Sequence, residues 1–119
     1  MKAIVCGGRQ FSDYAFLSDL MYEAKEKLGL TTIIQGEARG ADLLAKKWAI
    51  EAGLDVIGIR ADWDRHGRRA GYLRNVEMAD LNPDYIIAFR GGRGTQMMID
   101  IGERRGIRVF DIPKLMFNK

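Results

Sequence analysis

The chain has 119 residues, of which 47% are hydrophobic and 29% are charged, a balance typical of one globular domain. Its formal net charge of +3 favours anionic partners, and no apolar run approaches the roughly 20 residues that a membrane-spanning helix needs. A single cysteine and a single histidine exclude an internal disulfide and are too few ligands for a structural zinc site, so we expect no metal.

The N-terminal half alternates short apolar runs with helical patterns. Residues 3–6 are apolar throughout and predict a strand that ends at Gly7. The first residues lead straight into this strand without the apolar core or cleavage site of a signal peptide, so we expect a cytoplasmic protein. The patterns that follow predict a helix over 17–28, a strand over 31–34, a helix over 41–52 and a strand over 56–59.

The C-terminal half continues the alternation after a polar stretch over 61–71. Apolar spacing predicts a helix over 72–79 that stops before the Asn82-Pro83 pair. The remaining patterns predict a strand over 85–89, a helix over 95–105 and a strand over 107–112. The chain has neither a Pro/Gly/Ser-rich linker nor an internal repeat, which indicates one domain over residues 1–119.

The composition of the strands predicts the fold class. The predicted strands are apolar throughout instead of alternating with polar residues, which indicates burial on both faces and therefore a parallel sheet. Alternation of strands with helices predicts an α/β fold, with a parallel five-stranded sheet that carries helices on both faces. Ligands bind such sheets beyond the carboxyl ends of the strands.

Three glycine-rich clusters follow predicted strands and precede predicted helices. They are Gly7-Gly8-Arg9, Gly36-Glu37-Ala38-Arg39-Gly40-Ala41-Asp42 and Gly91-Gly92-Arg93-Gly94-Thr95. Glycine allows sharp turns and close approach of a ligand, and the following helix N-terminus attracts phosphate. The clusters therefore indicate phosphate or nucleotide binding, although none matches a P-loop or the dinucleotide fingerprint.

Four side chains near these clusters each have a structural and a functional interpretation. Thr95 could cap the last predicted helix or donate its hydroxyl to phosphate, and Asp42 could favour the helix dipole or accept from a ribose. Trp63 could pack its polar segment onto the sheet or stack on a base. Arg74 lies at the start of a predicted helix, where the positive end of the helix dipole disfavours a cation. It could be an ordinary surface arginine or could contact an anion there.

Taken in order, the motifs of residues 4–112 resemble the YspA-type, cpYpsA-related family of the SLOG superfamily. The motifs are Gly7-Gly8-Arg9, Gly36-x-Ala38-Arg39-Gly40-Ala41-Asp42, Ala61-Asp62-Trp63, Arg74-Asn75-x-x-Met78, Pro83-Asp84 and Ala88-Phe89-x-Gly91-Gly92-x-Gly94-Thr95. This resemblance implies a SLOG-type, Rossmann-like three-layer sandwich that senses or processes nucleotides or their derivatives. It also implies occurrence in bacteria or phages. The superfamily includes the Lonely-guy phosphoribohydrolases and the single-stranded DNA-binding DprA proteins.

The sequence departs from the Lonely-guy pattern where that pattern carries catalysis. Arg90 replaces a proline, Met98 stands where the catalytic glutamate belongs, and Asn75 replaces a lysine. Glu37 stands where family members usually have glycine, and a carboxylate there could bind a ribose or replace the missing acid. We therefore name Arg74 and Glu37 as the catalytic candidates.

The first hypothesis is a nucleotide-binding or nucleotide-sensing protein in which the nucleotide is a ligand and not a cofactor. Phosphate would lie on the loop over 91–95 beside Arg74, ribose near Glu37 or Asp42, and the base near Trp63 or Phe11. The predicted ligand-binding residues are Gly7, Gly8, Arg9, Gly36, Glu37, Gly40, Asp42, Trp63, Arg74, Asn75, Gly91, Gly92, Gly94 and Thr95.

Two alternatives remain open at this point. One is an N-glycosidic hydrolase of nucleoside monophosphates that uses Glu37 or Asp42 as its carboxylate. The other is single-stranded nucleic-acid binding, which only the basic charge balance supports. A homodimer formed through helices stays open as well, and we expect no membrane partner.

Overall fold

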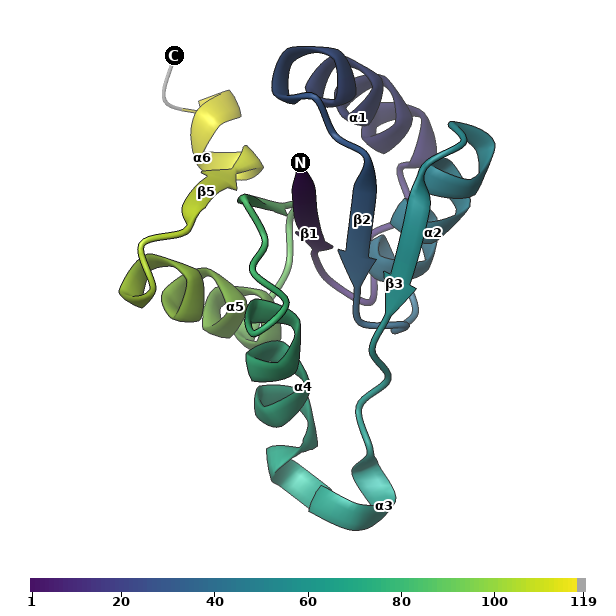
Figure 1. The fold of residues 1–119 in the computed structure, drawn as a ribbon. Helices are drawn as coiled ribbons and strands as arrows, with labels where there is room; N and C mark the ends of the chain where they lie inside the picture. The colour runs from purple at the N-terminus through teal and green to yellow at the C-terminus, as the bar shows by residue number, and fades with distance from the viewer. Residues whose placement is uncertain (118–119) are drawn as a thin grey trace.

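The structure is a computed structural model and describes residues 1–117. Its centre is a five-stranded sheet in which all the paired strands run parallel, in the order β3-β2-β1-β4-β5 (Figure 1). The strands are β1 (Lys2–Cys6), β2 (Thr32–Gln35), β3 (Asp55–Gly58), β4 (Tyr85–Ala88) and β5 (Arg108–Asp111). The predicted parallel α/β sheet is confirmed.

Helices cover both faces of this sheet and complete a Rossmann-like three-layer sandwich (Figure 1). The helices are α1 (Tyr14–Leu28), α2 (Ala41–Glu51), α3 (Trp63–His66), α4 (Ala70–Ala79), α5 (Arg93–Arg104) and α6 (Ile112–Phe117), with a 3-10 turn η1 (Gly67–Arg69) between α3 and α4. Side chains of α1 and α2 pack in one core cluster, and side chains of α4 and α5 pack in the other.

Strand β1 shows why the sheet is buried on both faces. Ala3 and Val5 belong to the core cluster under α1 and α2, whereas Ile4 and Cys6 belong to the cluster under α4 and α5. Successive side chains of a strand point to opposite faces, so a strand between two layers of helices needs apolar residues at every position. The uninterrupted apolar run that predicted this strand is therefore a direct result of its central place.

The strand order places the candidate site. The chain runs from β1 outward to β2 and β3, and then returns to the other side of β1 with β4 and β5. The order therefore switches between β1 and β4, where Cys6 is in register with Ala88. The loops that leave β1 and β4 diverge at such a switch point and leave a crevice at the carboxyl edge of the sheet. Both loops carry predicted glycine clusters.

The structure differs from the sequence predictions at several helix boundaries. The polar stretch over 61–71 contains α3 and η1, and α4 begins at Ala70. Asp62 caps α3, because its side chain accepts a hydrogen bond of 3.1 Å from the backbone N–H of Arg65. Helix α6 was not predicted. Within the described residues, no helix combines the length and the hydropathy needed to cross a membrane.

Candidate functional site

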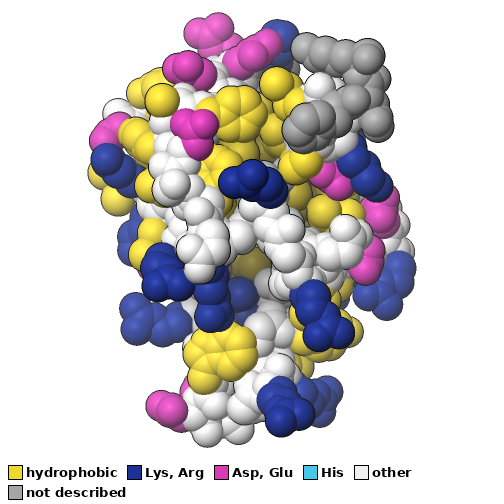
Figure 2. Space-filling model, turned by 180° about the vertical axis from the view of Figure 1, so that it is seen from behind, with side chains coloured by type: hydrophobic (Ala, Val, Ile, Leu, Met, Phe, Trp, Pro, Cys, Tyr) yellow, Lys and Arg dark blue, Asp and Glu magenta, His cyan; other side chains and the backbone are white. Residues whose placement is uncertain are grey.

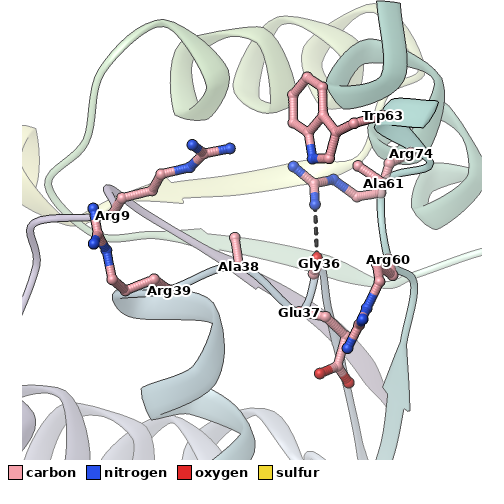
Figure 3. Close-up of a pocket in the computed structure, with 9 residues that line it drawn as sticks. All are labelled: Arg9, Gly36, Glu37, Ala38, Arg39, Arg60, Ala61, Trp63 and Arg74. Atoms are coloured by element: carbon pink, nitrogen blue, oxygen red, sulfur yellow. Dashed lines mark hydrogen bonds between the residues drawn. The ribbon is translucent and has the colours of Figure 1, made fainter. Parts of the chain in front are cut away.

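Two adjoining cavities lie at the carboxyl edge of the sheet, each lined by side chains from loops that follow different strands. The glycine cavity has a volume of about 440 Å³ and is lined by residues that include Gly7, Gly8, Asp42, Arg74, Asn75, Gly92, Gly94, Thr95 and Met98. The arginine cavity has a volume of about 460 Å³ and is lined by Arg9, Gly36, Glu37, Ala38, Arg39, Arg60, Ala61, Trp63 and Arg74 (Figure 3). The two cavities share Arg9, Ala38, Trp63 and Arg74.

The N-terminus of α5 faces the glycine cavity. Gly92 is the N-cap residue, and the Gln96 N–H donates the first helical hydrogen bond to the Gly92 carbonyl at 3.0 Å. The backbone N–H groups of the first turn precede that bond and have no partner within the helix. Added Cβ atoms at Gly92 and Gly94 would meet no other atom within 4 Å, so both glycines border open space. This helix end offers donors and a positive dipole to an anion.

Thr95 occupies a different position from the one that the sequence suggested. It is the third residue of α5 and not its N-cap, so of its two interpretations the capping one is wrong. Its side chain is only 8% exposed and lines the glycine cavity. The helix begins two residues earlier than predicted because Gly92 and not Thr95 adopts the non-helical cap conformation.

Several predicted glycines serve contacts between loops. Gly40 has a φ of +92°, and an added Cβ would collide with the carbonyl oxygen of Gly8. That oxygen accepts hydrogen bonds from the N–H groups of Phe11 and Ala41, both at 3.2 Å. An added Cβ at Gly91 would collide with the Thr95 hydroxyl and lie 2.8 Å from the backbone nitrogen of Gly8. The loops after β1, β2 and β4 therefore interlock, and Gly40 and Gly91 border neither cavity.

Arg74 is held between the two cavities by fixed partners. Its Nη1 donates to the Gly36 carbonyl at 2.7 Å, and its Nε donates to Asn75 Oδ1 at 3.0 Å. Asn75 Nδ2 donates in turn to the Gly94 carbonyl at 3.3 Å, which links this arginine to the first turn of α5. Burial lowers the pKa of Arg74 from its ordinary value, and the charge of Asp42 opposes that shift. The guanidinium is thus pre-positioned for an anion.

The reason that singled out Arg74 from the sequence does not hold. Arg74 is the fifth residue of α4 and lies a full turn beyond the helix start at Ala70. The dipole argument for an unfavourable cation at a helix N-terminus therefore does not apply to it. What marks this residue in the structure is its partly buried guanidinium and its place on the wall of both cavities.

Asp42 is a buried carboxylate in the glycine cavity. It is 6% exposed, and its Oδ2 accepts a hydrogen bond of 3.3 Å from the Ala38 N–H. Burial raises the pKa of Asp42 from 3.8 to about 6, and the nearby Arg74 charge limits that rise. A carboxyl group with such a pKa exchanges its proton close to neutral pH.

The Glu37 carboxylate is held by Gln35 and Lys46. Its Oε1 accepts from Gln35 Nε2 at 2.9 Å, and both carboxylate oxygens lie 3.0 Å from Lys46 Nζ. Figure 3 shows this carboxylate directed away from Arg74 and toward Arg60. Burial alone would raise the pKa of Glu37, but the hydrogen bonds from Gln35 and Lys46 lower it overall. Of the two acidic candidates, Asp42 is the one suited to proton transfer.

Trp63 and Phe11 have different environments. Trp63 is 49% exposed and lines both cavities, and the Arg9 guanidinium lies 5.7 Å from the centre of its ring. This exposure does not fit a residue that packs its segment onto the sheet. Phe11 packs against Phe89 with ring centres 5.3 Å apart and lines neither cavity. Trp63 is therefore the candidate for stacking on a base.

Sequence reasoning missed the residues that complete the arginine cavity. Arg39 and Arg60 line it together with Arg9 and Arg74, and Figure 2 shows basic side chains around a hollow on one face of the molecule. Gln35 is fully buried and donates to Glu37, and Lys46 pairs with the same carboxylate. The signal for Arg39 and Arg60 was present, because each follows closely on the carboxyl end of a strand.

Comparisons with known proteins agree with this architecture. The family model described as "YspA, cpYpsA-related SLOG family" matches residues 1–66. The chain is 34% identical over 119 residues to the Gene 61 protein of Mycobacterium phage D29, a match that covers 92% of this chain and 94% of that protein. No solved structure matches. The family match includes the loops after β1 and β2, and the phage protein extends the similarity beyond them.

Proposed function

Because the chain belongs to the YspA, cpYpsA-related SLOG family, we propose that it binds a nucleotide or a nucleotide derivative at the carboxyl edge of its sheet. One observation carries this proposal: the N-terminus of α5 opens into the glycine cavity beside a guanidinium that is already held in place. Backbone N–H donors, a positive helix end and a fixed arginine together recognise phosphate.

The proposed pose follows from what lines the glycine cavity. Phosphate lies at Gly92 and Gly94, within reach of the Thr95 hydroxyl and of Arg74. Asp42 offers a carboxylate to the ribose hydroxyls, and the exposed ring of Trp63 offers a stacking surface to the base. These groups lie at the start of α5, in α4, in α2 and in α3, so the ligand would bridge four separate segments of the chain.

We expect Gly92→Asp to weaken binding of nucleoside monophosphates strongly while it slightly stabilises the protein. Asp is a favoured N-cap residue, and the added side chain meets open space, so α5 should gain roughly a few tenths of a kcal/mol over the glycine cap. The same carboxylate occupies the phosphate position and repels it. Calorimetric titration with nucleoside 5′-monophosphates should show a Kd at least 30-fold higher than that of the unmodified protein.

Gly92→Asn is the matched control, because asparagine caps a helix equally well and carries no charge. It should gain the same stability and lose far less affinity than the aspartate variant. Equal affinities in the two variants would place phosphate elsewhere and overturn the proposed pose.

A second candidate function is hydrolysis of the N-glycosidic bond of the bound nucleotide, and the state of Asp42 favours it. Met98 is buried on the wall of the glycine cavity and supplies no acid, whereas Asp42 is the carboxylate among the residues that line that cavity. In the proposed step the C1′–N bond breaks as the Asp42 proton passes to the departing base. Water adds its hydroxyl to C1′, and its remaining proton restores Asp42.

If this reaction occurs, base release should be fastest below pH 6 and should fall as Asp42 ionises. Asp42→Asn should reduce the rate at least 100-fold, as measured by chromatography of the free base. Release that is unchanged in this variant would remove Asp42 from the mechanism. Glu37→Gln is the comparison, because that carboxylate is directed away from Arg74.

The stability of the Asp42→Asn variant tests the ionisation itself. The folded pKa of about 6 lies above the unfolded value near 3.8, so the folded state binds the proton more tightly between these values. The contribution of Asp42 to stability is complete below pH 3.8 and is lost as the pH rises through 6. Urea unfolding should show the asparagine variant gaining about 3 kcal/mol relative to the unmodified protein between pH 3.5 and 8.

A further inference from the structure

The arginine cavity carries more positive charge than the nearby carboxylates of Glu37 and Asp42 neutralise. Within residues 1–117, none of the ion pairs closer than 4.0 Å involves Arg9, Arg39, Arg60 or Arg74. The carboxylate on that wall, Glu37, pairs with Lys46, and although it is directed toward Arg60 it forms no ion pair with that arginine within 4.0 Å. Cations that line one concave surface without partners raise the local potential and select an anion. This cavity is therefore suited to a second anionic group, in addition to the one proposed at α5.

The sizes of the two cavities indicate how much ligand they hold. Small-molecule sites commonly measure about 300–1,000 Å³, and the cavities of about 440 and 460 Å³ each fall in the lower part of that range. Each volume suits one nucleotide unit. Because the cavities share Arg9, Trp63 and Arg74, a single ligand can extend from one into the other.

We propose that the ligand consists of two nucleoside units joined through phosphate, with one unit in each cavity. The proposal rests on the proposed function, since the glycine cavity must first bind a nucleotide. Arg74 lines both cavities and lies nearest the connecting phosphate, while Arg39 and Arg60 meet the second unit. The Trp63 ring, half exposed between the cavities, stacks on a base. A nucleoside monophosphate would leave the arginine cavity without its anion.

The test compares three probes by calorimetric titration at fixed salt: AMP, the 5′-phosphorylated dinucleotide pApA, and a 12-residue oligoadenylate. The unmodified protein should bind pApA at least tenfold more tightly than AMP, and the 12-residue strand no more tightly than pApA. Arg39→Gln/Arg60→Gln should weaken pApA binding at least tenfold and change AMP binding less than twofold. Both arginines are exposed, so the double variant should fold normally.

Arg104→Gln/Arg105→Gln is the matched control, since it removes the same charge at the far end of α5 and should leave both affinities unchanged. Equal affinities of the unmodified protein for AMP and pApA would overturn the two-unit ligand and leave the proposed function standing. Binding of none of the probes would overturn both. A 12-residue strand that binds tenfold more tightly than pApA would instead assign the site to a nucleic-acid polymer and overturn the proposal.

Discussion

Arg74→Gln is expected to raise the Kd for nucleoside monophosphates and for pApA by about 100-fold or more, because truncating a partly buried charged contact commonly costs 2–5 kcal/mol. Arg74 lines both cavities, and its hydrogen bonds to Gly36 and Asn75 hold the guanidinium in one orientation. Glutamine keeps some hydrogen-bonding capacity and loses the charge. Calorimetric titration of each probe against the variant measures the effect.

Arg105→Gln is the control for this substitution. Arg105 pairs with Asp80 at 2.7 Å on an exposed part of the surface and lines neither cavity, so its loss should change neither affinity. Removing the Arg74 charge should also raise the pKa of Asp42 above 6, because that charge opposes the effect of burial. Unchanged nucleotide affinity in the Arg74 variant would remove this residue from the site.

Gly40→Ala is expected to destabilise the fold by about 3–5 kcal/mol, among the largest effects of any single substitution here. Gly40 has a φ of +92°, a backbone angle that residues with a side chain rarely adopt, and an added Cβ would collide with the Gly8 carbonyl oxygen. Because the colliding atom belongs to the backbone, it cannot move aside by a side-chain rotation. Urea unfolding of the variant and the unmodified protein measures the difference in the free energy of unfolding.

Gly53→Ala separates the effect of the positive φ from the effect of the steric collision. Gly53 also has a positive φ, of +77°, but an added Cβ there meets no atom within 4 Å. It should therefore cost only the conformational penalty of about 1–2 kcal/mol. If both substitutions destabilise the protein equally, contact between the loops contributes nothing, and the close approach of Gly40 to Gly8 is not what requires glycine.

The order of strands and helices could be predicted from the sequence because each central strand is apolar at every position. A strand such as β1 contributes Ala3 and Val5 to one core cluster and Ile4 and Cys6 to the other, so its burial on both faces can be predicted from its apolar composition. Helix α3 was missed because four residues are too few for a periodic pattern, and only the cap at Asp62 marks its start. Helix α6, which has six residues, was missed for the same reason.

The candidate site was predictable in part. The location of the site at the carboxyl edge of the sheet follows from the glycine clusters, because the carboxyl ends of parallel strands meet at that edge. The opposite pKa shifts of Asp42 and Glu37 could not be predicted, because they depend on the burial of Asp42 and on the contact of Glu37 with Lys46, and both arise only in the folded chain. Arg39 and Arg60 could have been placed at this edge, because each follows a strand closely, but their meeting in one cavity depends on the strand order.

The interlocked loops also bear on how this architecture can diversify. The hydrogen bond that joins the loops after β1 and β2 runs between backbone atoms, from the Ala41 N–H to the Gly8 carbonyl, and does not depend on side-chain identity. The cavity walls are formed by exposed side chains such as Arg39, Arg60 and Trp63. These side chains can therefore change during evolution and bind a new ligand while the backbone of the loops stays the same, provided that the glycine at position 40 is retained.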